Sequence, residues 1–249
     1  MHSRQTHYLH AMGIRVWKAR GEALEEPVGL PVPLAPSTAP VESLPADAVA
    51  ATSRPDLALA QYDWEQLREA VAQCHSCAEL VANRTQTVFG VGDTQADWLV
   101  IGEAPGADED RQGEPFVGRA GQLLNAMLLS IGLRREQVYI ANILKCRPPN
   151  NRDPLPAEAQ TCVAFLQRQI ELLQPRIILV VGRIAAQNLL HTDTPIGKLR
   201  GKIHVCPGTD IPVVVTYHPA YLLRSPGEKA KAWDDLCLAR QTACHQAGE

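Results

Sequence analysis

Three polar side chains stand at the ends of apolar stretches, and their types could do chemistry together. Glu103 follows the apolar run 98–101, Asn142 lies within the run 138–144, and His218 follows the run 211–217. A carboxylate can hold water, an amide can read a polar ring, and an imidazole can donate a hydrogen bond to an anion. Because the carboxyl ends of parallel strands meet at one edge of a sheet, we expect the three to gather there. An α/β protein without such a site can show the same pattern by chance.

Four cysteines form a second group of interest. Cys74 and Cys77 make a C-x-x-C pair, and Cys146 and Cys162 follow as single residues. Four thiolates are the usual ligands of an iron–sulfur cluster, and they also bind structural zinc. Buried free thiols are the remaining alternative. The three other cysteines of the chain have no motif around them, and we interpret them as ordinary.

Strands and helices must position both groups. Apolar runs predict strands, and periodic apolar residues predict the helices that follow them. The expected strands are 98–101, 138–144, 176–181 and 211–217, and the expected helices are 63–74, 118–131, 157–173, 183–190 and 228–242. Strands that alternate with helices are typical of an α/β protein with a mostly parallel sheet covered on both faces.

The chain divides into three parts by composition. Residues 1–25 are a short segment of unknown role, and residues 26–60 are rich in proline and alanine. Such a composition buries too little apolar surface to offset its ordering entropy, so we expect 26–60 to be a disordered linker. Residues 61–249 have the patterning of a globular domain.

Charge and hydropathy limit the partners and the cellular locations that we expect for this protein. The net charge is −3, so any positive surface for nucleic acid must be local. The sequence contains no run of about 18 apolar residues that would span a membrane. The first residues contain no continuous apolar segment of the signal-peptide type. We therefore expect a cytoplasmic protein that does not bind a membrane.

Several separate motifs, in the right order, resemble those of the family 4 uracil-DNA glycosylases. The resemblance covers roughly residues 64–243 and rests on Gly102–Gly106 (GEAPG), Pro115–Gly118 (PFVG), Gly121–Leu124 (GQLL), Asn142 ahead of Lys145–Pro149 (KCRPP), and His218–Arg224 (HPAYLLR). It implies a three-layer α/β/α sandwich with a central four-stranded parallel sheet. It also implies a [4Fe–4S] cluster, whose ligands would be Cys74, Cys77, Cys146 and Cys162. The implied activity is that of a monofunctional DNA glycosylase, which flips uracil out of DNA, hydrolyses its N-glycosidic bond and starts base-excision repair of deaminated cytosine.

The resemblance assigns roles to three side chains. Phe116 would stack on the face of uracil, and Asn142 would pair with uracil O4 and N3–H, a pattern that cytosine reverses. His218 would donate a hydrogen bond to uracil O2, where negative charge develops as the bond breaks. The alternatives are a core phenylalanine, an asparagine that caps a turn and a structural histidine.

The glycine-flanked turn after the first strand is expected to approach the flipped nucleotide. Gly102 and Ala104 would line the uracil site, and Glu103 would orient the attacking water or hold the turn. Better-known uracil-DNA glycosylases have an aspartate that handles water where this chain has Ala104, so leaving-group stabilisation must carry most of the rate. Glu109 would assist catalysis or exclude the methyl group of thymine, unless it belongs to a solvated acidic surface.

Contacts with DNA are expected from local positive charge and from one leucine. A leucine can wedge into the gap that a flipped base leaves, although both candidate leucines also fit a helix core. The DNA-binding candidates are Lys198, Arg200, Lys202, Leu222, Leu223 and Arg224.

The expected substrate is uracil-containing DNA, and the protein is expected to be a monomer. We expect nucleoid association if the source is a bacterium, and a repair or replication protein as partner of the N-terminal segment. The main alternative is a non-catalytic iron–sulfur module that binds nucleic acid and is tethered to a replication or repair protein. The presence of Phe116, Asn142 and His218 together argues against a mere binding module.

Overall fold

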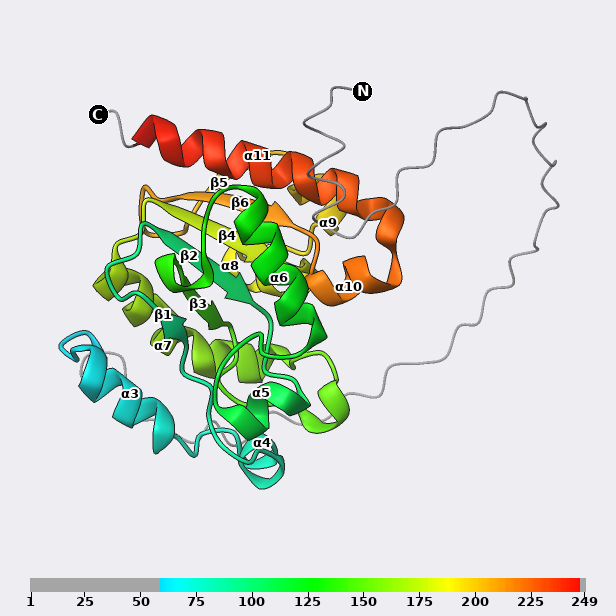
Figure 1. The fold of residues 1–249 in the computed structure, drawn as a ribbon. Helices are drawn as coiled ribbons and strands as arrows, with labels where there is room; N and C mark the ends of the chain where they lie inside the picture. Colours follow the sequence, from blue (N-terminus) through cyan, green and yellow to red (C-terminus); the bar gives the residue numbers. More distant parts are fainter. Residues whose placement is uncertain (1–58, 247–249) are drawn as a thin grey trace, which may run out of the picture.

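The computed structural model describes residues 59–246 of the chain (Figure 1). The predicted N-terminal segment and the predicted linker up to residue 58 lie outside the described residues. Leu59 already packs against Leu67, Val71 and Phe89 in a small core of buried residues. Leu59 and Ala60 are therefore part of the region that the structure describes.

A six-stranded sheet forms the centre of the molecule, in the order β1-β3-β2-β4-β6-β5. The strands are β1 Val91–Gly92, β2 Trp98–Gly102, β3 Tyr139–Asn142, β4 Ile177–Val181, β5 Ile203–Val205 and β6 Pro212–Thr216. The four inner strands are parallel, which confirms the predicted four-stranded parallel sheet. Two antiparallel edge strands, β1 and β5, extend it, and at two and three residues they are too short to give a sequence signal.

Helices connect the strands and cover both faces of the sheet. The helices are α3 Trp64–Ala72, α4 Ala78–Asn83, α5 Ala107–Gln112, α6 Arg119–Ser130, α7 Pro156–Leu173, α8 Arg183–Leu189, α9 Ile196–Leu199, α10 Pro219–Arg224 and α11 Lys229–Gln246, with short 3-10 turns η1 Arg135–Gln137, η2 Pro149–Asn151 and η3 Pro226–Glu228. The five expected helices are present. The unexpected ones, α4, α5, α9 and α10, have four to six residues, too few to show a helical period.

Alternate residues of each inner strand point to opposite faces, as the period of two requires. Leu99 and Ile101 share one core cluster with α7, α8 and α9, whereas Val100 shares another with α6, α10 and α11. Figure 1 shows the sheet between these two groups of helices. The predicted three-layer α/β/α sandwich is confirmed.

The order of strands reverses at β2, which pairs in parallel with both β3 and β4. In open α/β sheets, the ligand crevice lies at the carboxyl ends of the strands beside such a reversal. Here the residues that follow β2, β3 and β6 are Glu103, Ile143 and Tyr217, so the predicted site segments meet at this edge. The topology therefore places a crevice where the sequence places its polar side chains.

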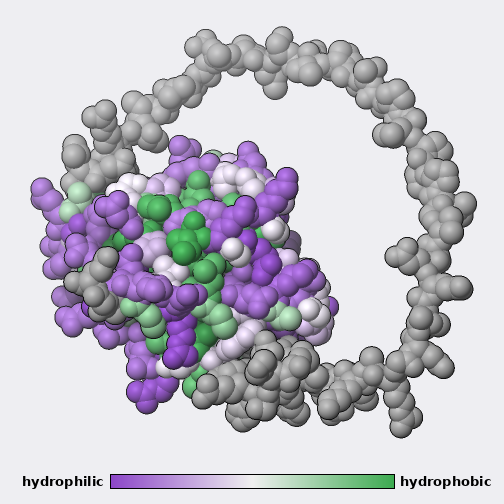
Figure 2. All heavy atoms as spheres, turned by 90° about the horizontal axis from the view of Figure 1, so that it is seen from above, coloured by the Kyte–Doolittle hydropathy of each residue, from purple (hydrophilic) through white to green (hydrophobic). Residues whose placement is uncertain are grey.

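The surface on the side of α11 is mainly hydrophilic, with a smaller apolar area near its centre (Figure 2). The large hydrophobic side chains exposed among the described residues include Ile203 and Val205 of the edge strand β5. No helix between residues 59 and 246 has the length and apolar character needed to cross a membrane.

Candidate active site

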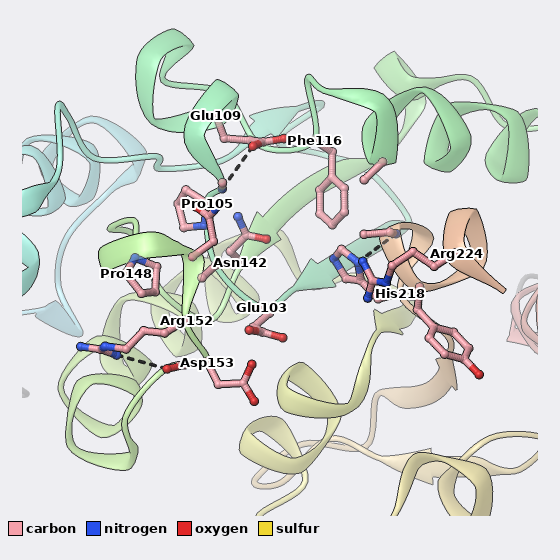
Figure 3. Close-up of a pocket in the computed structure, with 16 residues that line it drawn as sticks. Glu103, Pro105, Glu109, Phe116, Asn142, Pro148, Arg152, Asp153, His218 and Arg224 are labelled. Carbon is pink, nitrogen blue, oxygen red and sulfur yellow. Dashed lines mark hydrogen bonds between the residues drawn. The ribbon is translucent and has the colours of Figure 1, made fainter.

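A cavity of about 440 Å³ opens at the carboxyl ends of the inner strands (Figure 3). Its lining includes seven of the residues proposed from the sequence, namely Glu103, Ala104, Glu109, Phe116, Asn142, His218 and Arg224. They come from the turn after β2, from α5, from the loop before α6, from β3 and from both ends of α10. The structure thus brings together side chains that lie up to 121 positions apart, from Glu103 to Arg224.

Asn142 ends β3 and is 2% exposed. Its Oδ1 atom is buried and has no hydrogen-bond partner among the residues that the structure describes. A buried acceptor without a partner costs about 1–3 kcal/mol, so such atoms usually meet a ligand or water. Because Asn142 lines the cavity, its amide is suited to a polar group that enters there.

Phe116 lies above Asn142 in the cavity with its backbone in the left-handed region, at a φ of 55°. This conformation is uncommon for a bulky residue, and it turns the ring toward the sheet. The ring and that of His218 have centroids 5.6 Å apart and planes 32° from parallel. A Cβ atom on Gly102 would lie 2.7 Å from the Phe116 ring and 2.4 Å from Asn142 Oδ1, so glycine leaves the room that both side chains occupy.

His218 is the N-cap of α10, and its Nδ1 accepts a hydrogen bond from the Ala220 main-chain N–H at 3.1 Å. Burial and, to a smaller extent, the positive charge of Arg224 together lower its pKa to about 4. An imidazole that accepts through Nδ1 and stays neutral carries its proton on Nε2. The side chain is therefore a neutral hydrogen-bond donor at the cavity.

Glu103 follows β2, and burial raises the pKa of its carboxyl to about 7. The neighbouring carboxylate of Asp153 raises this pKa as well, whereas Arg183 lowers it. Arg183 forms an ion pair with Asp153 at 2.9 Å. Figure 3 shows the two carboxylates facing the same region of the cavity. A carboxyl that titrates near neutral pH is suited to general base catalysis.

Glu109, in the first turn of α5, accepts three main-chain hydrogen bonds. Its Oε2 accepts from Gly106 N–H at 3.1 Å, and its Oε1 accepts from Val117 and Gly118 N–H at 3.2 and 3.4 Å. The carboxylate thus joins the turn after β2 to the loop that carries Phe116. These contacts give Glu109 a positioning role, and a catalytic role for it stays a prediction.

The DNA-binding candidates differ in their surroundings. Arg224 lines the cavity, and Leu223 beside it is 37% exposed, as a wedge would require. Leu222 is 1% exposed and packs in the core with α6 and α11, so this leucine fits the alternative of a core residue. Lys198 and Lys202 are exposed outside the cavity lining.

Arg200 departs from the prediction. Its guanidinium forms an ion pair with Asp235, which is completely buried, at 3.0 Å, and it lies over the ring of Tyr217. The side chain therefore ties the loop after α9 to α11 instead of facing solvent for a phosphate. The sequence pattern Lys-Leu-Arg-Gly-Lys gave no sign of this buried partner.

The four cysteines of interest lie near one another. Cys77, Cys146 and Cys162 share a small apolar cluster with Leu80 and Leu144. The Arg84 guanidinium joins the fourth cysteine to them, because it donates to Cys146 Sγ at 2.8 Å and to the Cys74 carbonyl at 2.7 Å. Burial raises the pKa of the Cys77 thiol, and the nearby thiols of Cys146 and Cys74 raise it as well.

Within residues 59–246, no three histidine, cysteine or acidic side chains converge as the ligands of a single metal ion do. A zinc ion gathers four thiolates around one atom, whereas each thiolate of a four-iron cluster binds a different iron atom.

Three supporting residues had not been given a role from the sequence. Lys145 is 1% exposed, and its Nζ donates to the Asn142 carbonyl at 2.9 Å and to Gln169 Oε1 at 2.6 Å. Arg84 contacts the cysteines, and Arg135 contacts the loop of Phe116. Lys145 lies in the KCRPP motif, and this position could have indicated its role. Nothing in the sequence around Arg84 or Arg135 indicates a role for either arginine.

Comparisons with known proteins agree with the site. The profile of the uracil DNA glycosylase superfamily matches residues 89–237. The chain is 48% identical over 170 residues to the type-4 uracil-DNA glycosylase of Archaeoglobus fulgidus, an alignment that covers 65% of this chain and 85% of that protein. The type-4 enzyme of Thermotoga maritima is 44% identical over 163 residues, covering 65% of this chain and 83% of that protein.

The type-4 uracil-DNA glycosylase of Pyrobaculum aerophilum is 39% identical over 182 residues, which cover 71% of this chain and 92% of that protein. The profile match spans the strands, the cavity residues, Cys146 and Cys162, whereas Cys74 and Cys77 lie before it. The chain therefore belongs to the uracil-DNA glycosylase superfamily, in its type-4 branch.

Proposed function

We propose that this chain is a monofunctional uracil-DNA glycosylase that starts base-excision repair of deaminated cytosine. The observation that carries the proposal is that Phe116, Asn142 and His218 line one cavity. A ring to stack on, an amide to pair with and a neutral donor are what an everted uracil needs. The alternative of a non-catalytic tethered module is not favoured, because binding alone needs no donor for the leaving group.

Uracil recognition is assigned to Asn142 and Phe116. A stacked base must leave the duplex at a cost of a few kcal/mol, and contacts in the cavity offset that cost. The free Oδ1 of Asn142 would accept from uracil N3–H while its amide N–H donates to O4. Cytosine presents the opposite pattern and would leave both groups unpaired. Phe116 would contribute stacking, which any base provides.

Bond cleavage is assigned to His218 and Glu103. As the bond between the sugar C1′ and uracil N1 breaks, its electron pair moves onto the base, and negative charge builds on O2. The Nε2–H of His218 would donate to that oxygen without transferring its proton. Water would add to C1′ and lose a proton to the Glu103 carboxylate. None of the described lysines lines the cavity, which agrees with hydrolysis without Schiff-base chemistry.

The pH dependence of the reaction tests Glu103. Its pKa of about 7 means that the carboxylate form, which accepts a proton, predominates above neutral pH. We expect the single-turnover rate to fall as the pH drops from 8 to 6, by about tenfold per pH unit below the pKa. Glu103→Gln should be slow and lose this dependence over the same range. A Gln variant that retains the wild-type pH profile would remove Glu103 from the proton transfer.

The cofactor is proposed to be a [4Fe–4S] cluster on Cys74, Cys77, Cys146 and Cys162. The shared cluster of Cys77, Cys146 and Cys162, and the contacts of Arg84 with Cys74 and Cys146, support it. When bound, the cluster would supply structural cross-linking of the segments around Asn142, since glycosidic hydrolysis needs no redox step. Arg84 would donate a hydrogen bond to the Cys146 sulfur and offset part of the negative charge of the four thiolates.

Metal content tests this assignment. We expect the purified protein to be brown, to absorb at about 400 nm and to contain iron. Cys162→Ser should lose most of the iron and the absorbance, because it removes a ligand from α7. Cys206→Ser is the matched control, since Cys206 is also buried but lies in a different core cluster. Stoichiometric zinc without iron would contradict the proposal.

The proposed partner is uracil-containing DNA, held by Arg224, Lys198 and Lys202 with Leu223 as the wedge. Phosphate contacts from these cations would make binding weaken as salt rises. A monomeric state and a repair or replication partner of the N-terminal segment also stay predictions. We also propose a cytoplasmic location, beside the nucleoid if the source is a bacterium, because the proposed substrate is DNA.

The decisive experiment compares two oligonucleotides that differ in one base. A strand with a single uracil and a matched strand with thymine are incubated with the protein and then treated with alkali, which cleaves abasic sites. We expect cleavage only of the uracil strand. Release of free uracil, followed by chromatography, would exclude a contaminating nuclease. Absence of cleavage by iron-loaded protein would refute the proposed activity.

A further inference from the structure

The loop that carries Phe116 is held from outside the cavity. The guanidinium of Arg135, in η1, donates from Nη2 to the Pro115 carbonyl at 2.6 Å. Its Nη1 donates to the Phe116 carbonyl and to Asn125 Oδ1, each at 3.3 Å. One planar group therefore connects the Phe116 loop to α6 and to the turn that precedes β3.

A second close contact, with the backbone of α6, confines the Phe116 carbonyl. A Cβ atom on Gly121 of α6 would lie 1.7 Å from that oxygen, so only glycine lets the helix approach so closely. The oxygen thus contacts both a helix backbone and the Arg135 guanidinium. This double contact falls at the residue whose φ of 55° is uncommon for a bulky side chain.

Arginine is the residue type that this geometry requires. Its fork presents two N–H groups in fixed directions, whereas lysine offers one compact ammonium. Arg135 is half-buried, and burial lowers the pKa of its guanidinium, whereas the nearby carboxylates of Glu114, Glu136 and Glu109 partly offset that effect. A neutral side chain of similar length would leave the Pro115 and Phe116 carbonyls without this donor.

We propose that Arg135 is a positioning residue that keeps the Phe116 ring preorganised to stack on the flipped base. The inference rests on the proposed function, and it adds a residue that does not itself line the cavity. Without the guanidinium, the loop relaxes toward ordinary backbone angles and the ring leaves the stacking position for part of the time. Binding to a partly populated competent state weakens by the populated fraction.

This mechanism predicts a particular split of the kinetic constants. In Arg135→Met, we expect the KM for uracil-containing DNA and the inhibition constant for free uracil to rise together by about 10- to 30-fold. Saturating DNA shifts the loop into its binding-competent state, so the kcat should change less than threefold. Arg135→Lys should recover part of the loss. Arg134→Met, which alters the exposed neighbour, is the matched control.

A double-mutant cycle with Phe116→Ala shows whether Arg135 acts through the ring. In the Phe116→Ala background, Arg135→Met should change the inhibition constant by less than about twofold, because coupled residues are not additive. Equal effects in both backgrounds would overturn the proposal, as would a lower melting temperature without any change in uracil inhibition. If Arg135→Met does not fold, the same cycle is run with Arg135→Lys.

The two hypotheses fail in different ways. A wild-type protein that releases no uracil from DNA refutes the proposed function. A wild-type protein that does release it, combined with additive Arg135 and Phe116 variants, refutes only the positioning role of Arg135.

Discussion

Replacing His218 with alanine is expected to lower the single-turnover rate of uracil release by about 10²- to 10³-fold, the usual effect of removing one donor to a developing oxyanion. The imidazole is neutral because its pKa is about 4, and its Nδ1 already accepts from Ala220. The Nε2–H is therefore present at every pH above about 5. The rate is measured with a uracil-containing duplex at saturating protein.

Binding measurements separate this effect from a general loss of structure. DNA affinity, followed by fluorescence anisotropy with an uncleavable duplex, should stay within about threefold of wild type, because phosphate contacts dominate affinity. His245→Ala changes an exposed histidine near the end of α11 and should leave both quantities unchanged. An active His218→Ala protein would remove this side chain from the mechanism.

Gly102→Ala is the second substitution from which we expect a large effect. Its backbone conformation accepts alanine, since its φ lies outside the left-handed region, but the new methyl group would meet Asn142 and the Phe116 ring at 2.4–2.7 Å. Both side chains must then move away from the positions that suit uracil. A displacement of about 1 Å can cost about 10²-fold in rate, so we expect a loss of that size.

The matched control for Gly102→Ala is Gly197→Ala, at a glycine where an added methyl group meets no atom within 4 Å. Both variants should fold, as judged by circular dichroism and a cooperative thermal transition. Only Gly102→Ala should lose uracil release and inhibition by free uracil. Wild-type kinetics in Gly102→Ala would mean that the cavity is wider than the structure indicates, and that Asn142 and Phe116 do not need their present positions.

The inner strands could be predicted from the sequence because each is a continuous apolar run, buried on both faces. The edge strand β5 could not, since its exposed Ile203 and Val205 alternate with a half-buried histidine over only three residues. Helix α10 also escaped prediction, although its N-cap is His218. A six-residue helix that begins with His-Pro has too few turns to show a hydrophobic face.

The cavity side chains were identified because they belong to motifs, and their partners were missed because those contacts cross long stretches of sequence. The Arg84 contact with Cys146 spans 62 residues, and that of Arg135 with Pro115 spans 20. The local charge pattern also gave Arg200, Lys198 and Lys202 the same predicted role. In the structure, Arg200 is paired with a buried aspartate, whereas the two lysines are exposed. Burial and long-range pairing are properties of the fold, so single-sequence patterns do not reveal them.

The stretch from Asn142 to Cys146 is buried at every position, and three of its side chains have separate duties. Asn142 lines the cavity, Lys145 donates to the Asn142 carbonyl, and Cys146 lies with Cys77 and Cys162 in one cluster. Inserting or deleting one residue here would rotate all of them out of place at once. We therefore expect a one-residue insertion or deletion between Asn142 and Cys146 to disturb the cavity and the cysteine cluster together.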